Sequence, residues 1–278
     1  MEANCEVAQF QASDGYCWRY RHYPANGRPR GRVVYVHGIQ SHGGWYAGSC
    51  SFLASAGFQV FFLDRRGSGL NEQARGDTPS FRRLLDDIAE FLTWLHGRQP
   101  LPTHLLGVSW GGKTATALHK RHPGLTTSLV LLCPGFRPRV RPPFRQRARI
   151  LLARLFRPGK LFPIPLNDPE LFTATPRWLD FLRNDSLSLH QATARFLVES
   201  VRLDLYLRRC PRAVQVPVFL ALAEHDRIID NEQTRRFVDS FASPQKQMIE
   251  YPGTHHTLEF EPDPTPIFRD LAAWLDSR

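Results

Sequence analysis

The chain has 278 residues, 42% of them hydrophobic, and its 36 Lys and Arg against 26 Asp and Glu give a formal net charge of +10. A disordered chain is excluded, because 19 Phe, 7 Tyr and 6 Trp supply ample apolar surface to bury. The length suits one large α/β domain, with or without an insertion, better than two independent domains. No run approaches the roughly 18 apolar residues that span a bilayer, and the opening MEANCEVAQF lacks the apolar core of a secretory signal. We therefore expect a cytoplasmic protein.

Strand and helix patterns alternate along most of the chain. Residues 6–23 predict an antiparallel hairpin that turns at Ser13-Asp14-Gly15. Apolar runs of this chain indicate strands buried on both faces, as in a parallel sheet covered by helices. Residues 80–96 place their apolar side chains on one helical stripe, so we expect an α/β fold. The predicted buried strands are residues 32–37, 58–63, 104–108, 128–133 and 216–223.

The alternation breaks between Pro134 and Arg208, which predicts a mostly helical insertion. Residues 91–167 contain 13 Lys and Arg but neither Asp nor Glu, so the positive charge is concentrated there. Arginines and apolar residues between Arg149 and Phe156 predict a short basic amphipathic helix; the alternative is an ordinary solvated arginine face. Nucleic-acid binding is not expected, because no recognised binding motif accompanies the patch. The apolar residues are Ile150, Leu151, Leu155 and Phe156.

The five cysteines, at positions 5, 17, 50, 133 and 210, are widely spaced and form no CxxC pair. This spacing indicates reduced thiols rather than a disulfide framework or a metal site. Cys133 lies in the apolar run LVLLC and is expected to be a small core residue.

The residues Gly107-Val108-Ser109-Trp110-Gly111 stand where the strand HLLGV runs into a helical segment. A G-x-S-x-G sequence in this context is typical of a nucleophile elbow, whereas the pentapeptide alone would only indicate a glycine-rich turn. Side chains two residues before and after the serine would clash in so tight a turn, which explains both glycines. We therefore expect Ser109 to be a nucleophile, with the amide dipoles of the following helix pointing toward it.

A serine hydroxyl needs a base to take its proton and a carboxylate to orient that base, in the chain order Ser, acid, His. Asp226 follows the strand VPVFLALA where a sheet-edge acid belongs. Its rivals are Glu224 and Asp230, although Asp230 is better placed to cap a following helix. The candidate bases are His255 and His256, after the predicted strand QMIEYP. A metal site is not expected, because adjacent histidines point apart and a second cluster is not evident.

An acyl-transfer intermediate carries an oxyanion, which needs two preorganised N–H donors. One donor is expected from the backbone of Trp110. The other is expected from the loop HGIQSHGGWY, where Ile39 follows His37-Gly38.

Five motifs in order resemble the α/β-hydrolase superfamily, and within it the monoacylglycerol lipase and lysophospholipase-like serine hydrolases: HGIQSHGGWY, LDRRGSG, GVSWGG, EHDRIID and GTHH. The resemblance covers about residues 30–135 and 210–276. It implies a mostly parallel eight-stranded sheet flanked by helices, with core residues 1–135 and 206–278 and a helical cap at 136–205. It also implies a nucleophile, an acid, a base and two oxyanion-hole amides, at Ser109, Asp226, His256, Ile39 and Trp110 respectively.

The resemblance implies a serine carboxylic-ester hydrolase of the lipase or esterase type, acting through an acyl-enzyme on lipophilic esters such as monoacylglycerols or lysophospholipids. It implies no cofactor and no metal. Trp110 stands where these lipases usually have Met. A Trp at this position also occurs in proline iminopeptidases of the same superfamily. Those enzymes usually carry an H-G-G-P-G loop, which HGIQSHGG does not match. The alternatives are an aminopeptidase or amidase, an acyltransferase, and a non-catalytic interaction module. We also expect peripheral contact between the basic cap and anionic membranes.

His42 and Tyr46 are interpreted as structural or pocket-lining residues. The turn from Asp64 to Gly67 is expected to be structural. In the cap, one set of apolar residues either lines an acyl pocket or forms the core of the cap itself: Phe172, Trp178, Phe181 and Leu182.

Overall fold

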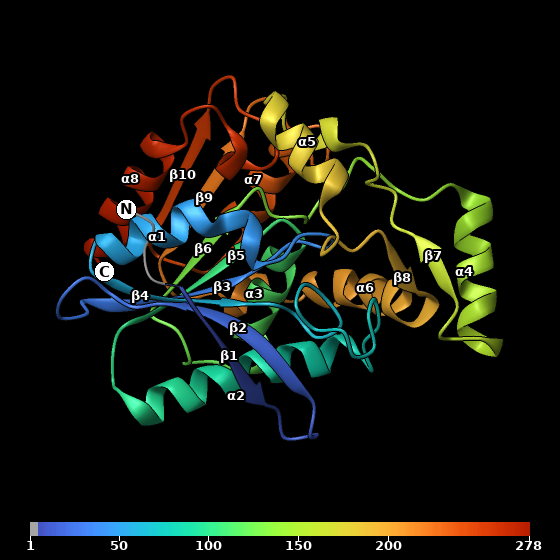
Figure 1. Ribbon diagram of the computed structural model, residues 1–278, viewed down its shortest axis with the longest axis horizontal. Coiled ribbons are helices and arrows are strands. Elements are labelled where there is room, and N and C mark those ends of the chain that lie inside the picture. Colours follow the sequence, from blue (N-terminus) through green and yellow to red (C-terminus); the bar gives the residue numbers. More distant parts are fainter. Residues whose placement is uncertain (1–4) are drawn as a thin grey trace.

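The computed structural model describes residues 5–278, and its central feature is an eight-stranded sheet (Figure 1). The strand order is β1-β2-β4-β3-β5-β6-β9-β10, and the strands from β4 to β10 in this order run parallel. The predicted mostly parallel eight-stranded sheet is therefore confirmed. The strands are β1 (Glu6–Gln11), β2 (Cys17–Tyr23), β3 (Gly31–Val36), β4 (Phe58–Leu63), β5 (Thr103–Val108), β6 (Ser128–Leu132), β9 (Val218–Ala223) and β10 (Lys246–Tyr251).

The first two strands form the predicted hairpin. Gln11 pairs with Cys17, and the turn is closed by backbone hydrogen bonds from the Ala12 N–H to the Tyr16 carbonyl and from the Gly15 N–H to the Ala12 carbonyl; Gly15 has a φ of 81°. β2 pairs antiparallel with β4, so the hairpin extends the sheet at the edge opposite β10.

The central strands explain the apolar runs in the sequence. Every residue of β3, β5, β6 and β9 is buried, because helices cover both faces of the sheet. A strand covered on both faces has no solvent-facing side and so does not alternate between apolar and polar residues. The five predicted strands are confirmed, with ends that differ by at most two residues.

Helices α1 and α8 lie on one face of the sheet, and α2 covers the other (Figure 1). Ser80 caps α2, because its side chain accepts the Arg83 N–H, and the ring of Phe91 packs against Trp18 with centroids 5.2 Å apart. The predicted helix at 80–96 is thus confirmed and ends two residues later, at Arg98. The core helices are α1 (Ala47–Ser55), α2 (Phe81–Arg98), α3 (Trp110–Arg121), α7 (Asn231–Asp239) and α8 (Thr265–Asp276).

The segment between β6 and β9 leaves the sheet and returns to it. It is mostly helical, as expected, but it also contains a two-stranded antiparallel sheet that the sequence pattern did not reveal. Each of these strands has only three residues, too few for a recognisable period of two. The elements are α4 (Phe144–Phe156), β7 (Leu161–Pro163), α5 (Pro176–Asn184), β8 (Gln191–Thr193) and α6 (Ala194–Leu207).

Helix α4 lies at the outer end of this insertion, far from the sheet (Figure 1). It is longer than the predicted Arg149 to Phe156 segment, and its apolar residues divide between two faces. Ile150 and Ala153 are buried against Phe162 and Ala194, whereas the other apolar side chains are exposed. Among the helices of residues 5–278, none combines the length and the apolarity that crossing a bilayer requires. The exposed apolar residues of α4 are Phe144, Leu151, Leu152, Leu155 and Phe156.

Candidate active site

Ser109 stands at the junction between β5 and α3, in a backbone conformation that few residues other than glycine adopt. Its φ is 51° and its ψ is −121°, and such strain is typical of functional turns. The flanking glycines are required by close backbone approach. A Cβ at Gly111 would lie 2.2 Å from the carbonyl oxygen of Val36, and one at Gly107 would lie 2.6 Å from the Cα of Gly112. The predicted elbow therefore has the tight geometry that its glycines indicate.

The hydroxyl of Ser109 is one end of a chain of hydrogen bonds. It lies 2.9 Å from Nε2 of His256, and Nδ1 of the same ring lies 2.7 Å from Oδ2 of Asp226. Because a carboxylate accepts, Nδ1 carries the proton, and Nε2 is left free to accept from the serine. This is the arrangement in which an imidazole can act as a general base toward a serine hydroxyl.

Asp226 is held by the turn after β9. Its Oδ1 accepts the backbone N–H groups of Ile228 and Ile229 at 2.8 and 2.9 Å, which leaves Oδ2 for His256. Burial by itself would raise the pKa of Asp226, but the charge of His256 and these hydrogen bonds outweigh it, so the pKa is lowered. The carboxylate is therefore ionised at neutral pH and stabilises an imidazolium.

The rival residues of the sequence analysis have other partners. Glu224 accepts the backbone N–H of Gly253, and Asp230 caps α7 by accepting the N–H of Gln233. Nδ1 of His255 lies 3.2 Å from Oε1 of Glu261, so this histidine is paired with that carboxylate and not with Ser109. The structure thus brings Asp226 and His256, and not their neighbours, to Ser109.

The two predicted oxyanion-hole residues flank the serine. A Cβ at Gly38 would lie 3.3 Å from the Cβ of Ser109, so the backbone that leads into Ile39 passes directly beside the nucleophile. Trp110 is the first residue of α3, and the first N–H groups of a helix have no acceptor within it. Both backbone segments therefore lie beside Ser109, whose hydroxyl would attack an acyl carbonyl.

The insertion contacts this centre through aromatic residues. The indole of Trp110 packs on Phe196 of α6, with ring centroids 5.4 Å apart, and its Nε1 donates to the Ser200 hydroxyl at 2.9 Å. The ring of Phe172 meets the imidazole of His256 edge to face at 6.1 Å. Trp178 instead stacks on Phe260, at 4.4 Å. Of these aromatic residues, Phe172 therefore contacts the triad, Phe196 contacts the residue after the nucleophile, and Trp178 packs on the buried Phe260.

His42 of the loop HGIQSHGGWY donates its Nε2–H to the buried carboxylate of Asp185 in the insertion, at 2.9 Å, and Trp45 Nε1 donates to the same carboxylate at 2.7 Å. Burial would raise the pKa of Asp185, but its hydrogen bonds with His42, Ser188 and Trp45 lower it strongly. Sequence reasoning did not find Asp185, because its partners lie about 140 residues away and no local pattern marks it.

Potential metal-ligating atoms gather at one place in the described chain. One atom each from Cys133, Asp226 and His256 lies within 4.8 Å of the others. Both ring nitrogens of His256 are already engaged, and burial raises the pKa of the Cys133 thiol far above its usual value. A neutral thiol is a poor metal ligand. The closeness of these three side chains is therefore better explained by the hydrogen bonds of His256 with Asp226 and Ser109, with Cys133 packed beside them, than by a metal site.

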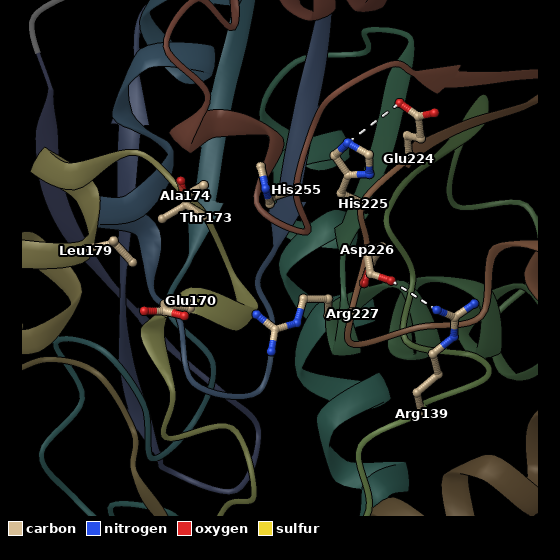
Figure 2. Close-up of a pocket in the computed structure, with 10 residues that line it drawn as sticks. All are labelled: Arg139, Glu170, Thr173, Ala174, Leu179, Glu224, His225, Asp226, Arg227 and His255. Carbon is tan, nitrogen blue, oxygen red and sulfur yellow. Dashed lines mark hydrogen bonds and ion pairs between the residues drawn. The ribbon is translucent and has the colours of Figure 1, made fainter.

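A cavity of about 580 Å³ adjoins the loop that carries Asp226. Figure 2 shows Glu170 and Thr173 of the insertion on one side and His225 and Asp226 on the other, with the Arg227 guanidinium pointing between them. Arg139 donates to the backbone oxygen of Asp226 at 3.4 Å. The wall is predominantly polar, and within residues 5–278 neither arginine forms an ion pair with a carboxylate.

Comparisons with known proteins show which family the chain belongs to. Residues 27–263 match the family described as serine aminopeptidase, S33. The chain is 27% identical over 259 residues to a monoacylglycerol lipase of Mycolicibacterium smegmatis, covering 90% of this chain and 89% of that protein. It is 24% identical over 255 residues to phospholipase YtpA of Bacillus subtilis, covering 90% and 96% of the two chains. A solved structure of a soluble variant of monoglyceride lipase from Saccharomyces cerevisiae, in complex with a substrate analog, superposes with a TM-score of 0.85 at 21% identity, covering 100% of this chain and 96% of that one. The chain therefore belongs to the serine aminopeptidase S33 family, with an α/β-hydrolase fold.

Proposed function

We propose that the protein is a serine hydrolase that cleaves carboxylic esters with lipophilic acyl chains, such as monoacylglycerols and lysophospholipids. The observation that carries the proposal is the hydrogen-bonded chain from Asp226 through His256 to Ser109 on a strained elbow. Similarity over nine-tenths of the chain to a monoacylglycerol lipase and a phospholipase supports lipid esters as the substrate class.

In the proposed reaction, the Oγ of Ser109 attacks the ester carbonyl carbon while Nε2 of His256 takes the hydroxyl proton. The carbonyl oxygen becomes an oxyanion that accepts from the backbone N–H groups of Ile39 and Trp110. As the intermediate collapses, His256 passes its proton to the departing alkoxide, which leaves as the alcohol. Water then attacks the acyl-enzyme by the same route and releases the acid, so these residues need neither a cofactor nor a metal.

We also propose that residues 136–205 form a cap over the triad, between core segments 1–135 and 206–278. Phe196 and Phe172 support this division, because each brings an apolar ring of the insertion against Trp110 or His256. Apolar walls at the nucleophile favour a lipophilic acyl chain over a polar peptide. An amidase or an acyltransferase would form a similar acyl-enzyme, so the cap rather than the triad selects the substrate.

The polar end of such a lipid needs a different environment, and the cavity of Figure 2 provides one. It is lined by Asp226 and His255, and so adjoins His256, whose Nε2 gives its proton to the leaving alcohol. Arg139 and Arg227 supply guanidinium groups that suit a phosphate-bearing alcohol. The double variant Arg139→Gln with Arg227→Gln should lower kcat/KM for a lysophospholipid about tenfold more than for the monoacylglycerol with the same acyl chain. Equal effects on both substrates would exclude this headgroup site.

Helix α4 supports a peripheral contact with anionic membranes. Phe144, Leu155 and Phe156 are each about three-quarters exposed, on a segment that is rich in arginine. Exposed apolar side chains bordered by cations are typical of helices that lie in a lipid interface. Hydrolysis of a monoacylglycerol in anionic vesicles should therefore exceed that in neutral vesicles and should fall as salt is raised. Equal rates on both vesicles at low salt would remove the membrane contact from the proposal.

The function is tested by initial rates on p-nitrophenyl butyrate and p-nitrophenyl laurate, with Ser109→Ala beside the wild type. We expect both esters to be cleaved, the laurate with the higher kcat/KM, and the variant to lose at least about a thousandfold. Equal activity of the variant would refute Ser109 as the nucleophile. Failure of the wild type on both esters, with an anilide of a peptide cleaved instead, would favour the aminopeptidase alternative.

A further inference from the structure

The peptide unit between Gly38 and Ile39 has two ends with different tasks. Its N–H, on Ile39, is one of the two proposed donors to the oxyanion. In a trans peptide the carbonyl and the N–H point in opposite directions within one plane. Whatever holds the carbonyl oxygen of Gly38 therefore also fixes the direction of the Ile39 N–H.

Two donors hold that carbonyl oxygen. Nδ1 of His37 lies 2.7 Å from it, and Nη1 of Arg65 lies 3.1 Å from it. Arg65 also donates its Nη2 to the carbonyl oxygen of Ile39, at 3.1 Å. The guanidinium of Arg65 thus donates to the carbonyls on both sides of the Ile39 N–H, and these hydrogen bonds fix the orientation of this short stretch of backbone.

Arg65 also sets the protonation of His37. The backbone N–H of Arg65 donates to Nε2 of His37 at 2.8 Å, so the proton of this imidazole resides on Nδ1, facing Gly38. Burial, and then the charge of Arg65, lowers the pKa of His37 well below its usual value. A neutral His37 with its proton on Nδ1 is therefore a fixed second donor to the same carbonyl.

The guanidinium is enclosed between the core and the insertion. Its Cζ lies 5.0 Å from the ring centroid of Trp110 and 5.1 Å from that of Phe196. Burial lowers the pKa of Arg65 to about 9, with the charge of Asp64 opposing the shift, so the side chain is still a cation at neutral pH. Cation–π contacts with these two rings, which also pack on each other, hold it in place.

Arg65 differs from the neighbouring Arg66 in the partners of its guanidinium. Arg66 is equally buried, but it forms ion pairs with Asp14 and Asp87. Within residues 5–278, Arg65 forms no ion pair with a carboxylate; its Nη groups are bonded to the carbonyls of Gly38 and Ile39. Burying a cation without a counter-ion costs free energy. Because no carboxylate pairs with Arg65 in the described chain, its charge can polarise the peptide groups of Gly38 and Ile39 to which it donates.

We propose that Arg65 is a positioning residue of the oxyanion hole, which orients and polarises the Gly38–Ile39 peptide so that the Ile39 N–H is a stronger donor to the developing negative charge. The proposal rests on the function proposed above and adds a residue that acts through the backbone of Ile39. It replaces the sequence interpretation of the turn from Asp64 to Gly67 as merely structural.

The test compares Arg65→Met and Arg65→Lys with Arg66→Met, a matched control that removes a buried arginine one residue away. On p-nitrophenyl butyrate we expect Arg65→Met to lower kcat roughly 10- to 100-fold with KM within about threefold, because the interaction strengthens in the transition state. Arg65→Lys should recover part of kcat, since one cation can still reach one carbonyl. Arg66→Met should lose thermal stability while kcat per folded enzyme stays within about threefold.

A tetrahedral adduct separates positioning from a structural role. An alkyl boronic acid bonds to Oγ of Ser109, whose proton passes to His256, and the resulting boronate places a negatively charged oxygen in the oxyanion hole. Its Ki should rise in Arg65→Met by the same factor as kcat falls, while the Ki of butyrate, which forms no adduct, stays unchanged. Unchanged boronate affinity, or equal losses in both arginine variants, would overturn the proposal. If wild type neither cleaves the ester nor binds the boronate, the proposed function itself fails.

Discussion

The sheet edge that carries Ser109 and the insertion between β6 and β9 hold their residues in different ways. At the sheet edge, backbone hydrogen bonds position the residues. The N–H of Ser109 donates to the carbonyl of Leu132, and two backbone N–H groups donate to the carboxylate of Asp226. The insertion also has backbone hydrogen bonds to the core, such as that from Leu189 to Gln40, but its contacts around the site are made by side chains, among them Asp185, Phe196 and Ser200. The difference teaches that backbone geometry positions the triad, whereas we expect that the sequence of the insertion can change, and with it the substrate, without disturbing the triad.

The largest expected effect is on the sheet edge. In Asp226→Asn the amide no longer favours the Nδ1–H tautomer of His256, so Nε2 cannot accept the serine proton. We expect kcat on p-nitrophenyl butyrate to fall about 10³- to 10⁴-fold with little loss of fold. Glu224→Gln is the control, since its carboxylate lies in the same loop but accepts the N–H of Gly253 instead of pairing with His256. Its kcat should stay within about threefold of the wild type. A similar loss in both variants would show that this loop acts as a whole rather than through one carboxylate.

The second prediction concerns the attachment of the insertion. Asp185→Ala removes the buried partner of His42 and Trp45, and should lower the free energy of unfolding by roughly 2–4 kcal/mol. Because the folded-state pKa of Asp185 is lowered, its contribution is present above the ordinary carboxyl pKa and is lost as pH falls. Denaturant unfolding at about pH 2.5 and at pH 7 should therefore differ less in the variant than in the wild type.

Asp180→Ala is the matched control for Asp185, because Asp180 is an exposed acid of α5, the helix that ends just before Asp185, and its ion pair is with Arg183. Its free energy of unfolding should change by less than about 0.5 kcal/mol. Equal destabilisation by the two substitutions would contradict a specific attachment at Asp185.

The third prediction concerns the exposed apolar face of α4. Leu155→Ser with Phe156→Ser should lower monoacylglycerol hydrolysis on anionic vesicles about fivefold, while rates on p-nitrophenyl butyrate in solution stay unchanged. Val201→Ser with Leu205→Ser removes two exposed apolar residues from α6 and should leave both rates unchanged. An equal loss on vesicles in both pairs would indicate that apolar surface in general, and not α4, drives the contact.

The smallest expected effect lies in the core behind the triad. Glu259 accepts the N–H of Ser49 at the start of α1, and burial raises its pKa to about 7. Between about pH 5 and pH 7 the folded protein keeps a proton that the unfolded chain releases, so stability falls as pH rises through this range. Glu259→Gln should remove this part of the fall, seen as a smaller change in Tm between pH 5 and pH 8. An identical change in both proteins would indicate that Glu259 titrates normally.

The sequence indicated the sheet edge far better than the insertion, for a physical reason. Ser109 directly follows β5, and Asp226 and the histidine pair come shortly after β9 and β10, so a local pattern places each of them at one edge of the sheet. That pattern left His255 and His256 open, and the resemblance to a family selected between them. The contacts of the structure then bring His256 to Ser109.

The parts that sequence reasoning missed depend on partners far along the chain. Asp185 is defined by His42 and Trp45, and Arg65 by the carbonyls of Gly38 and Ile39, and neither set is visible in a local window. The division of the α4 apolar residues into two faces likewise depends on packing against α6. Strands of three residues, such as β7 and β8, are too short to show a period.

The central claim is that Ser109 carries the acyl group between the two halves of the reaction. Rapid quenching of the protein with p-nitrophenyl laurate, followed by mass spectrometry of its peptides, tests this directly. The account predicts a lauroyl group on the peptide that contains Ser109 in the wild type and its absence in Ser109→Ala. A lauroyl group on another residue, or release of p-nitrophenol at the wild-type rate by the alanine variant, would contradict it.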